Sequence, residues 1–245
     1  MFSSAELLRP EYLLWLLKGS LVTLELAALV IPLATLLGIL IALLRDSPLR
    51  PLAWPAASFA SVLRNSPLLV QLFFWYFGAT ALLPEALREW LNAEHLLRID
   101  GVGSLPLPGF EFLCGGFGLL LYSSAYISEE IRAGLRGVPV TQRQAAAALG
   151  MRPEQIFLHV LTPQALRIAL PPLMGQYMNI VKNSSLTMAI GVMELSYAAR
   201  QVETVSFRTF QAFGVSTLLY ILIIAVLEVL AIHAGRRFPV AGARR

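Results

Sequence analysis

The sequence contains few of the side chains on which soluble enzymes depend. Only 14% of its 245 residues are charged, whereas about a quarter are charged in ordinary soluble domains. The single cysteine, Cys114, excludes an internal disulfide. The three histidines, His95, His159 and His233, are scattered, so we expect no metal site. The spans predicted below contain no visible acid–base or metal constellation, so we expect no catalytic residues.

A nucleotide-binding sequence is also missing. No segment matches the pattern G-x-x-x-x-G-K-[ST], in which backbone amides and a lysine hold phosphate groups. If the protein takes part in a process driven by ATP, another chain must therefore hydrolyse the nucleotide. We expect this chain to carry no cofactor.

Apolar residues are abundant and make up 57% of the chain. They form long runs without alternation, and a helix needs roughly 20 apolar residues to cross a bilayer. Such runs favour helices over the alternating strands of a membrane barrel. We predict an all-α membrane protein with one transmembrane domain over 1–245. It has about five spans, at about 12–44, 52–83, 112–134, 164–182 and 207–233.

Two segments between the predicted spans are polar. Residues 84–110 are rich in acidic residues and end in glycines and prolines, which predicts a loop with a short surface helix. Residues 137–163 begin as an alanine-rich helix, which Gly150 breaks before a second short helix follows Pro153. A soluble hairpin between spans suits docking to another protein, but a plain connector on the membrane surface fits the residues equally well.

The arginines predict how the chain is oriented. With five spans and the N-terminus outside, most arginines fall on the side of residues 137–163 and of the C-terminal tail. Basic residues accumulate on cytoplasmic loops. We therefore predict an N-terminus outside, a cytoplasmic C-terminus and an external loop at 84–110.

A spaced pattern occurs within residues 137–163. Its members are Gln144, Ala145, Ala146, Gly150 and Pro163. Their spacing resembles the EAA loop of permease subunits of ATP-binding-cassette importers, which reads E-A-A, three residues, G, nine residues and I-x-L-P. The resemblance implies that 137–163 is a coupling loop that contacts an ATPase. Gln144 replaces the usual glutamate and Thr162 replaces a leucine, so the usual glutamate contact is not expected in the same form.

Further blocks resemble the polar amino-acid branch of that family over roughly residues 12–235. They are RNSPLLVQLFFWYFG at 64–78, YISEEIRAG at 126–134, TPQALRIALPP at 162–172 and KNSSL at 182–186. Together with the long insert at 84–110, they look most like the glutamate/aspartate permeases. The resemblance implies a type I importer permease fold in a bacterial inner membrane. It also implies alternating access, a second permease subunit, two cytoplasmic ATP-binding subunits and an external amino-acid-binding protein.

Two basic residues inside the predicted spans are candidates for substrate binding. Arg64 and Lys182 can reach the middle third of the membrane, where charged residues are usually functional. Arg64 suits the α-carboxylate of an amino acid as a bidentate fork, with Lys182 as a second cation. The predicted hydrogen-bonding neighbours are Asn65, Ser66, Gln71, Asn183 and Ser184. Glu129 and Glu194 are weaker candidates for the ammonium group.

Several alternatives remain open at this point. Arg64 and Lys182 can instead be structural residues that cap broken helices, and the substrate site can lie in the partner subunit. The substrate can be another polar amino acid, such as glutamine, histidine or arginine. An ion-coupled secondary carrier is a further alternative, although such carriers usually contain inverted repeats, which we do not find here.

Overall fold

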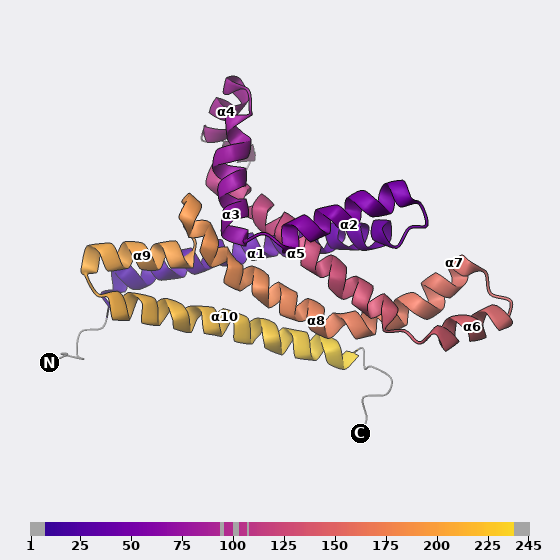
Figure 1. Ribbon diagram of the computed structural model, residues 1–245. Coiled ribbons are helices and arrows are strands. Elements are labelled where there is room, and N and C mark those ends of the chain that lie inside the picture. Colours follow the sequence, from indigo (N-terminus) through magenta and orange to yellow (C-terminus); the bar gives the residue numbers. More distant parts are fainter. Residues whose placement is uncertain (1–7, 94–95, 100–102, 107, 238–245) are drawn as a thin grey trace. The chain divides into compact units, whose positions relative to one another are not determined.

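The computed structural model describes residues 8–93, 96–99, 103–106 and 108–237, and nearly all of them are helical (Figure 1). The all-α prediction is therefore confirmed. Four helical segments are long and apolar enough to cross a membrane: Pro10–Arg45, Phe110–Arg136, Pro153–Ile190 and Thr209–His233. A shorter apolar segment covers Leu68–Ala79. Because α1 has 36 residues, it is about 54 Å long, which exceeds the hydrocarbon thickness.

The helical elements follow one another with short connections. They are α1 (Pro10–Arg45), α2 (Arg50–Arg64), α3 (Leu68–Phe73), the π-helical η1 (Phe74–Ala79), α4 (Glu85–Asn92), α5 (Phe110–Arg136), α6 (Val140–Ala148), α7 (Pro153–Gln155), the π-helical η2 (Ile156–Leu161), α8 (Thr162–Asn183), the 3₁₀-helical η3 (Ser184–Ile190), α9 (Leu195–Ser206) and α10 (Thr209–Arg237). Between α4 and α5 the chain forms a small antiparallel hairpin, β1 (Leu96–Ile99) and β2 (Gly103–Pro106), in which Leu96 pairs with Pro106. A loop with a short surface helix was expected at 84–110, and the β-hairpin was not.

The span expected at 52–83 is not one continuous helix. The helix α2 ends at Arg64, and a new helix, α3, begins at Leu68 after Pro67 in an extended conformation. Proline has no N–H to donate, and its ring disfavours the helical conformation of the residue before it. Ser66 and Pro67 therefore divide the segment and place Arg64 at a helix end.

The described chain forms two compact units. Unit 1 comprises Met1–Val30, Ser66–Leu120 and Val181–Tyr220, and unit 2 comprises Ile31–Asn65, Leu121–Ile180 and Ile221–Arg245. The long helices α1, α5, α8 and α10 contribute residues to both units.

In unit 1 the first part of α1 packs against α9. Leu16, Leu195 and Val202 are fully buried in this contact. Gly19 allows the close approach, because a Cβ atom there would lie 2.8 Å from the Cβ of Ala198. Small residues commonly permit such contacts between membrane helices.

In unit 2 glycines bring three helices together. A Cβ atom on Gly38 of α1 would lie 2.6 Å from the Cγ2 of Ile127 on α5. A Cβ atom on Gly134 of α5 would lie 2.6 Å from the carbonyl oxygen of Ala165 on α8. The part of α5 that follows Leu121 is therefore held between α1 and α8, and it carries the charged residues described next.

Candidate functional site

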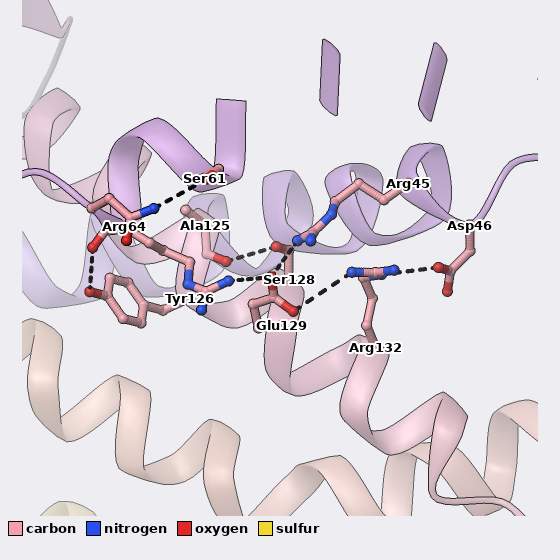
Figure 2. A network of polar contacts seen from close by, with 10 residues as sticks. Arg45, Asp46, Ser61, Arg64, Ala125, Tyr126, Ser128, Glu129 and Arg132 are labelled. Carbon is pink, nitrogen blue, oxygen red and sulfur yellow. Dashed lines mark hydrogen bonds and ion pairs between the residues drawn. The ribbon is translucent and has the colours of Figure 1, made fainter. Parts of the chain in front are cut away.

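Arg64 lies at the end of α2 and faces α5 within unit 2 (Figure 2). Its guanidinium donates to Oε1 of Glu129, and its carbonyl oxygen accepts a 3.2 Å hydrogen bond from the Tyr126 hydroxyl. The guanidinium carbon lies 5.8 Å from the centre of the Tyr126 ring, within the range of a cation–π interaction. The side chain remains 38% exposed, so further contacts to Arg64 are sterically possible.

Glu129 is the centre of a larger ionic network in unit 2 (Figure 2). Arg45 at the end of α1 donates to Oε1 of Glu129 at 2.7 Å, and Nη1 of Arg132 lies 3.7 Å from Oε2. Arg132 also donates to Asp46 at 3.0 Å. The network thus contains three arginines and two carboxylates, which leaves a surplus positive charge. Glu129, a weak candidate for an ammonium partner, instead binds arginines.

The three neighbours predicted just after Arg64 are held by local hydrogen bonds. Asn65 is exposed, and its amide donates to the Ser61 hydroxyl at 3.2 Å. The Gln71 amide is buried and donates to the Ser66 hydroxyl at 2.8 Å and to the Ser66 carbonyl at 3.2 Å. Gln71 therefore supports the turn around Pro67, which is a structural role compatible with the predicted one.

The second predicted cluster lies where α8 passes into η3, in unit 1. Lys182 is exposed and forms no salt bridge within the part of the chain that the structure describes. Asn183 is half-buried. The Ser184 hydroxyl is fully buried and donates to the carbonyl oxygen of Val181 at 2.8 Å. The side chain of Ser184 thus serves its own helix, whereas Lys182 remains available to a ligand.

A polar row that the sequence analysis did not single out lies between α5 and α8 in unit 2. The Gln176 amide donates to Oε1 of Glu130 at 3.1 Å, and the Asn179 amide lies 3.5 Å from Oε1 of Gln176. Glu130 is half-buried and forms no salt bridge within the described residues. The spacing of three between Gln176 and Asn179, inside an apolar helix, was a signal available in the sequence.

Glu194, the other weak candidate for an ammonium partner, is a buried helix cap in unit 1. Its Oε1 accepts from the Tyr197 amide at 2.9 Å, which places it at the N-cap of α9. Its Oε2 accepts from the Tyr220 hydroxyl at 2.5 Å. Burial raises the pKa of the Glu194 carboxyl, and the surrounding donors only partly offset this effect. These contacts give Glu194 a structural role as a helix cap.

The segment 137–163 forms a compact helical hairpin in unit 2. The helix α6 ends in a Schellman motif, because the Gly150 amide donates to Ala147 at 3.0 Å and the Met151 amide to Ala146 at 3.2 Å. Gly150 has a φ of +78°, a conformation that favours glycine. Ala146 is buried, whereas Gln144 and Ala145 are exposed.

The hairpin also exposes apolar side chains. Val140, Leu149 and Leu158 are all exposed, and Leu149 is 83% accessible. Val140 begins α6 and Leu149 follows its end, whereas Leu158 lies in η2, within the helical segment Pro153–Ile190. Pro163 lies near the start of α8, two residues after the π-helical η2 ends at Leu161, within the helical segment Pro153–Ile190.

Four helices that are long and apolar enough to cross a membrane, together with the shorter apolar helix Leu68–Ala79, are the architecture of a membrane-embedded protein. A solved structure, described as an amino acid ABC transporter with histidines, has this fold with a TM-score of 0.76. The two chains are 29% identical, and the match covers 93% of this chain and 95% of that one. The prediction of a type I importer permease fold is therefore confirmed.

Sequence comparison then defines the family. A family model described as "Binding-protein-dependent transport system inner membrane component" matches residues 34–238. The glutamate/aspartate import permease protein GltJ of Escherichia coli (strain K12) is 32% identical over 232 residues, which is 94% of this chain and 90% of that protein. The probable glutamine ABC transporter permease protein GlnM of Bacillus subtilis (strain 168) is 34% identical over 193 residues, or 79% of either protein. The chain belongs to the binding-protein-dependent transport system inner membrane components.

This membership confirms the resemblance to permeases of ATP-binding-cassette importers for amino acids. The chain is a transport subunit of the inner membrane rather than an enzyme, and a separate subunit hydrolyses ATP. Permeases of this family work with ATP-binding subunits and with substrate-binding proteins. The membership alone assigns no particular amino acid, because the two relatives named above differ in substrate.

Proposed function

We propose that the chain is a permease subunit of an ATP-driven importer for glutamate and aspartate, which moves its substrate by alternating access. A binding protein delivers the amino acid from outside, against loop 84–110. Two cytoplasmic ATP-binding subunits and a second permease subunit complete the transporter. In this orientation the N-terminus lies outside and the hairpin 137–163 lies in the cytoplasm.

The observation that carries the proposal is the surplus positive charge of the network around Glu129. Three arginines and two carboxylates meet where the ends of α1 and α2 reach α5. The cluster is partly buried and carries one uncompensated positive charge, which favours a ligand of opposite sign. Acidic amino acids carry one negative charge more than neutral ones. The similarity to GltJ supports the same substrate class.

The proposed substrate site uses the residues predicted from the sequence. In unit 2, the side chain of Arg64 is 38% exposed beside Glu129 and is the proposed partner of a substrate carboxylate. In unit 1, the exposed Lys182 is the second proposed cation. The other proposed contacts come from Asn65, Ser66, Gln71, Asn183 and Ser184. Glu130, held by Gln176, is the acid that we add for the ammonium group.

The hairpin couples this site to the ATP-binding subunits. Gln144, Ala145, Ala146, Gly150 and Pro163 define it in the sequence. Its exposed apolar residues Val140, Leu149 and Leu158 suit a groove on an ATP-binding subunit. When ATP brings the two ATP-binding subunits together, each hairpin moves as a rigid body with the subunit that it contacts. The spans then change between inward-facing and outward-facing states.

The test is the ATPase activity of the reconstituted complex with its binding protein and a panel of amino acids. We expect glutamate and aspartate to stimulate hydrolysis most, and Arg64→Ala to lower uptake without reducing assembly. Stimulation by arginine or histidine but not by acidic amino acids would refute the proposed substrate. Uptake that persists after ATP depletion and collapses with an ion gradient would refute ATP-driven transport.

Glutamine is the second candidate substrate. The relative GlnM supports it, and so does the neutral amide row of Gln176 and Asn179 beside Glu130. The same panel of amino acids distinguishes the two candidate substrates. In a glutamine importer, glutamine should stimulate ATP hydrolysis and glutamate should not. If glutamine is the substrate, Gln176→Leu should lower glutamine uptake more than it lowers assembly with the ATP-binding subunits.

A further inference from the structure

An apolar groove runs between α1 and α2 in unit 2. It has a volume of about 360 Å³ and is lined only by apolar side chains. The lining residues are Leu37, Leu40, Ile41 and Leu44 on α1 and Pro51, Leu52, Pro55, Ala56 and Phe59 on α2. Its volume lies within the range of roughly 300–1,000 Å³ that is usual for small-molecule sites. Several lining residues, among them Leu40 and Leu52, are exposed, so the groove opens to the surroundings.

One end of the groove lies beside the turn that joins α1 to α2, where α1 ends at Arg45 and α2 begins at Arg50. Leu44 and Pro51, which line the groove, directly adjoin these two arginines in the sequence. The other end, at Leu37 and Phe59, is apolar. The groove therefore has the polarity of an amphiphile, with a cationic head region and an apolar body.

The basic end retains positive charge after the ion pairs of the network are formed. Arg45 binds Glu129, and Asp46 binds Arg132. Arg50 is exposed and forms no ion pair within the described part of the chain. Arg45 is largely buried and engaged by Glu129, so an anion at the turn would find the exposed side chain of Arg50.

We propose that this groove binds an anionic phospholipid, with an acyl chain along the apolar lining and the phosphate at Arg50. Basic pockets between membrane helices recognise anionic headgroups. The apolar lining favours a hydrocarbon chain over a soluble phosphate. The bound lipid would hold α2 against α1 at the point where the α1–α2 turn meets the Glu129 network.

The experiment is native mass spectrometry of the purified full-length permease, released from nanodiscs that contain equal amounts of phosphatidylglycerol and phosphatidylcholine. We expect the wild type to retain phosphatidylglycerol preferentially. Arg50→Gln should lower that preference about fivefold, which corresponds to about 1 kcal/mol. The matched control is Arg143→Gln on the exposed face of α6, which should leave the preference unchanged.

A second pair of variants tests the groove itself. Ala56→Phe fills the groove and should reduce the number of retained lipids, whereas Ser58→Phe, on the same helix but outside the lining, should not. Addition of glycerol phosphate without chains should not displace the lipid. Equal retention of both lipids, equal effects of Arg50→Gln and Arg143→Gln, displacement by glycerol phosphate, or a second permease chain in place of lipid would each overturn the proposal. None of these readouts depends on the transported substrate.

Discussion

Arg64 donates to the same oxygen of Glu129, Oε1, that Arg45 binds at 2.7 Å. Two cations from different helices, α2 and α1, thus converge on one atom of α5. Like charges at such short range repel each other unless the anion between them is ionised. Glu129 is therefore the residue on which the arrangement of these three helix segments in unit 2 depends.

Loss of the Glu129 charge should destabilise the protein. In Glu129→Gln the partly buried arginines Arg45 and Arg132 lose their shared carboxylate. Removal of one partner of a fully buried ion pair costs about 3–5 kcal/mol, and the partial exposure of Glu129 reduces this cost. We expect a lower midpoint in denaturant unfolding of the purified chain in detergent. Glu154→Gln is the control, because Glu154 is exposed on α7. Equal midpoints for the two variants would contradict the central role of Glu129.

The contact between α1 and α5 gives a second prediction. A Cβ atom on Gly38 would lie 2.6 Å from Ile127, and overpacking of this kind typically costs about 1–3 kcal/mol. Gly38→Ala should therefore lower the thermal midpoint. At Gly214 on α10 an added Cβ meets nothing within 4 Å, so Gly214→Ala should leave the midpoint unchanged or raise it. An unchanged thermal midpoint in Gly38→Ala would contradict the close packing of α1 against α5.

The helical class was predictable because apolar runs of this length have no other stable form in lipid. The bend at Gly150 was predictable for a local reason, since a helix that stops at glycine commonly uses its left-handed conformation. The break after Arg64 was missed, although Ser66-Pro67 carried the signal. A long apolar segment is assigned to one helix mainly by its length and periodicity. A single proline inside it is then easily interpreted as a kink and not as a helix end.

The partners of charged residues were much harder to predict. Arg64 and Glu129 are 65 positions apart, and the pairing depends on how closely α2 approaches α5. The sequence offered Glu129 as an ammonium partner because nothing in it indicates that two further arginines meet the same carboxylate. The polar row at Glu130 and Gln176 was overlooked because each residue alone is unremarkable, and only the packing of α5 on α8 joins them.

Glu194 gives a prediction about pH. Burial raises the pKa of its carboxyl in the folded protein above the unfolded value of about 4.3. The folded state therefore binds the proton more tightly, so this contribution to stability is complete below the unfolded pKa and is lost as the pH rises through the folded pKa. Glutamine cannot ionise, so the stability of the Glu194→Gln variant should not show this loss as the pH rises.

The measurement is the unfolding free energy of both proteins in detergent across this pH range. Relative to Glu194→Gln, the wild type should become less stable as the pH rises from about 4 towards neutrality. Thr23→Val is a useful comparison, because it removes a donor at 3.5 Å from the carboxylate but keeps the titrating group. A difference between wild type and Glu194→Gln that is independent of pH, or grows in favour of the wild type, would contradict the assignment.

The hairpin supplies the last prediction, which concerns Gly150. Proline fixes φ near −65°, whereas Gly150 has a φ of +78° and donates its amide to Ala147. Gly150→Pro should therefore destroy the Schellman motif and abolish pull-down of the ATP-binding subunit. Gly150→Ala keeps the amide and carries only the left-handed cost of about 1–2 kcal/mol, so it should weaken association less. Because an added Cβ at Gly150 meets nothing within 4 Å, the two variants differ through the backbone and not through packing. If Gly150→Pro associates with the ATP-binding subunit as well as the wild type does, the bend at Gly150 plays no part in that contact.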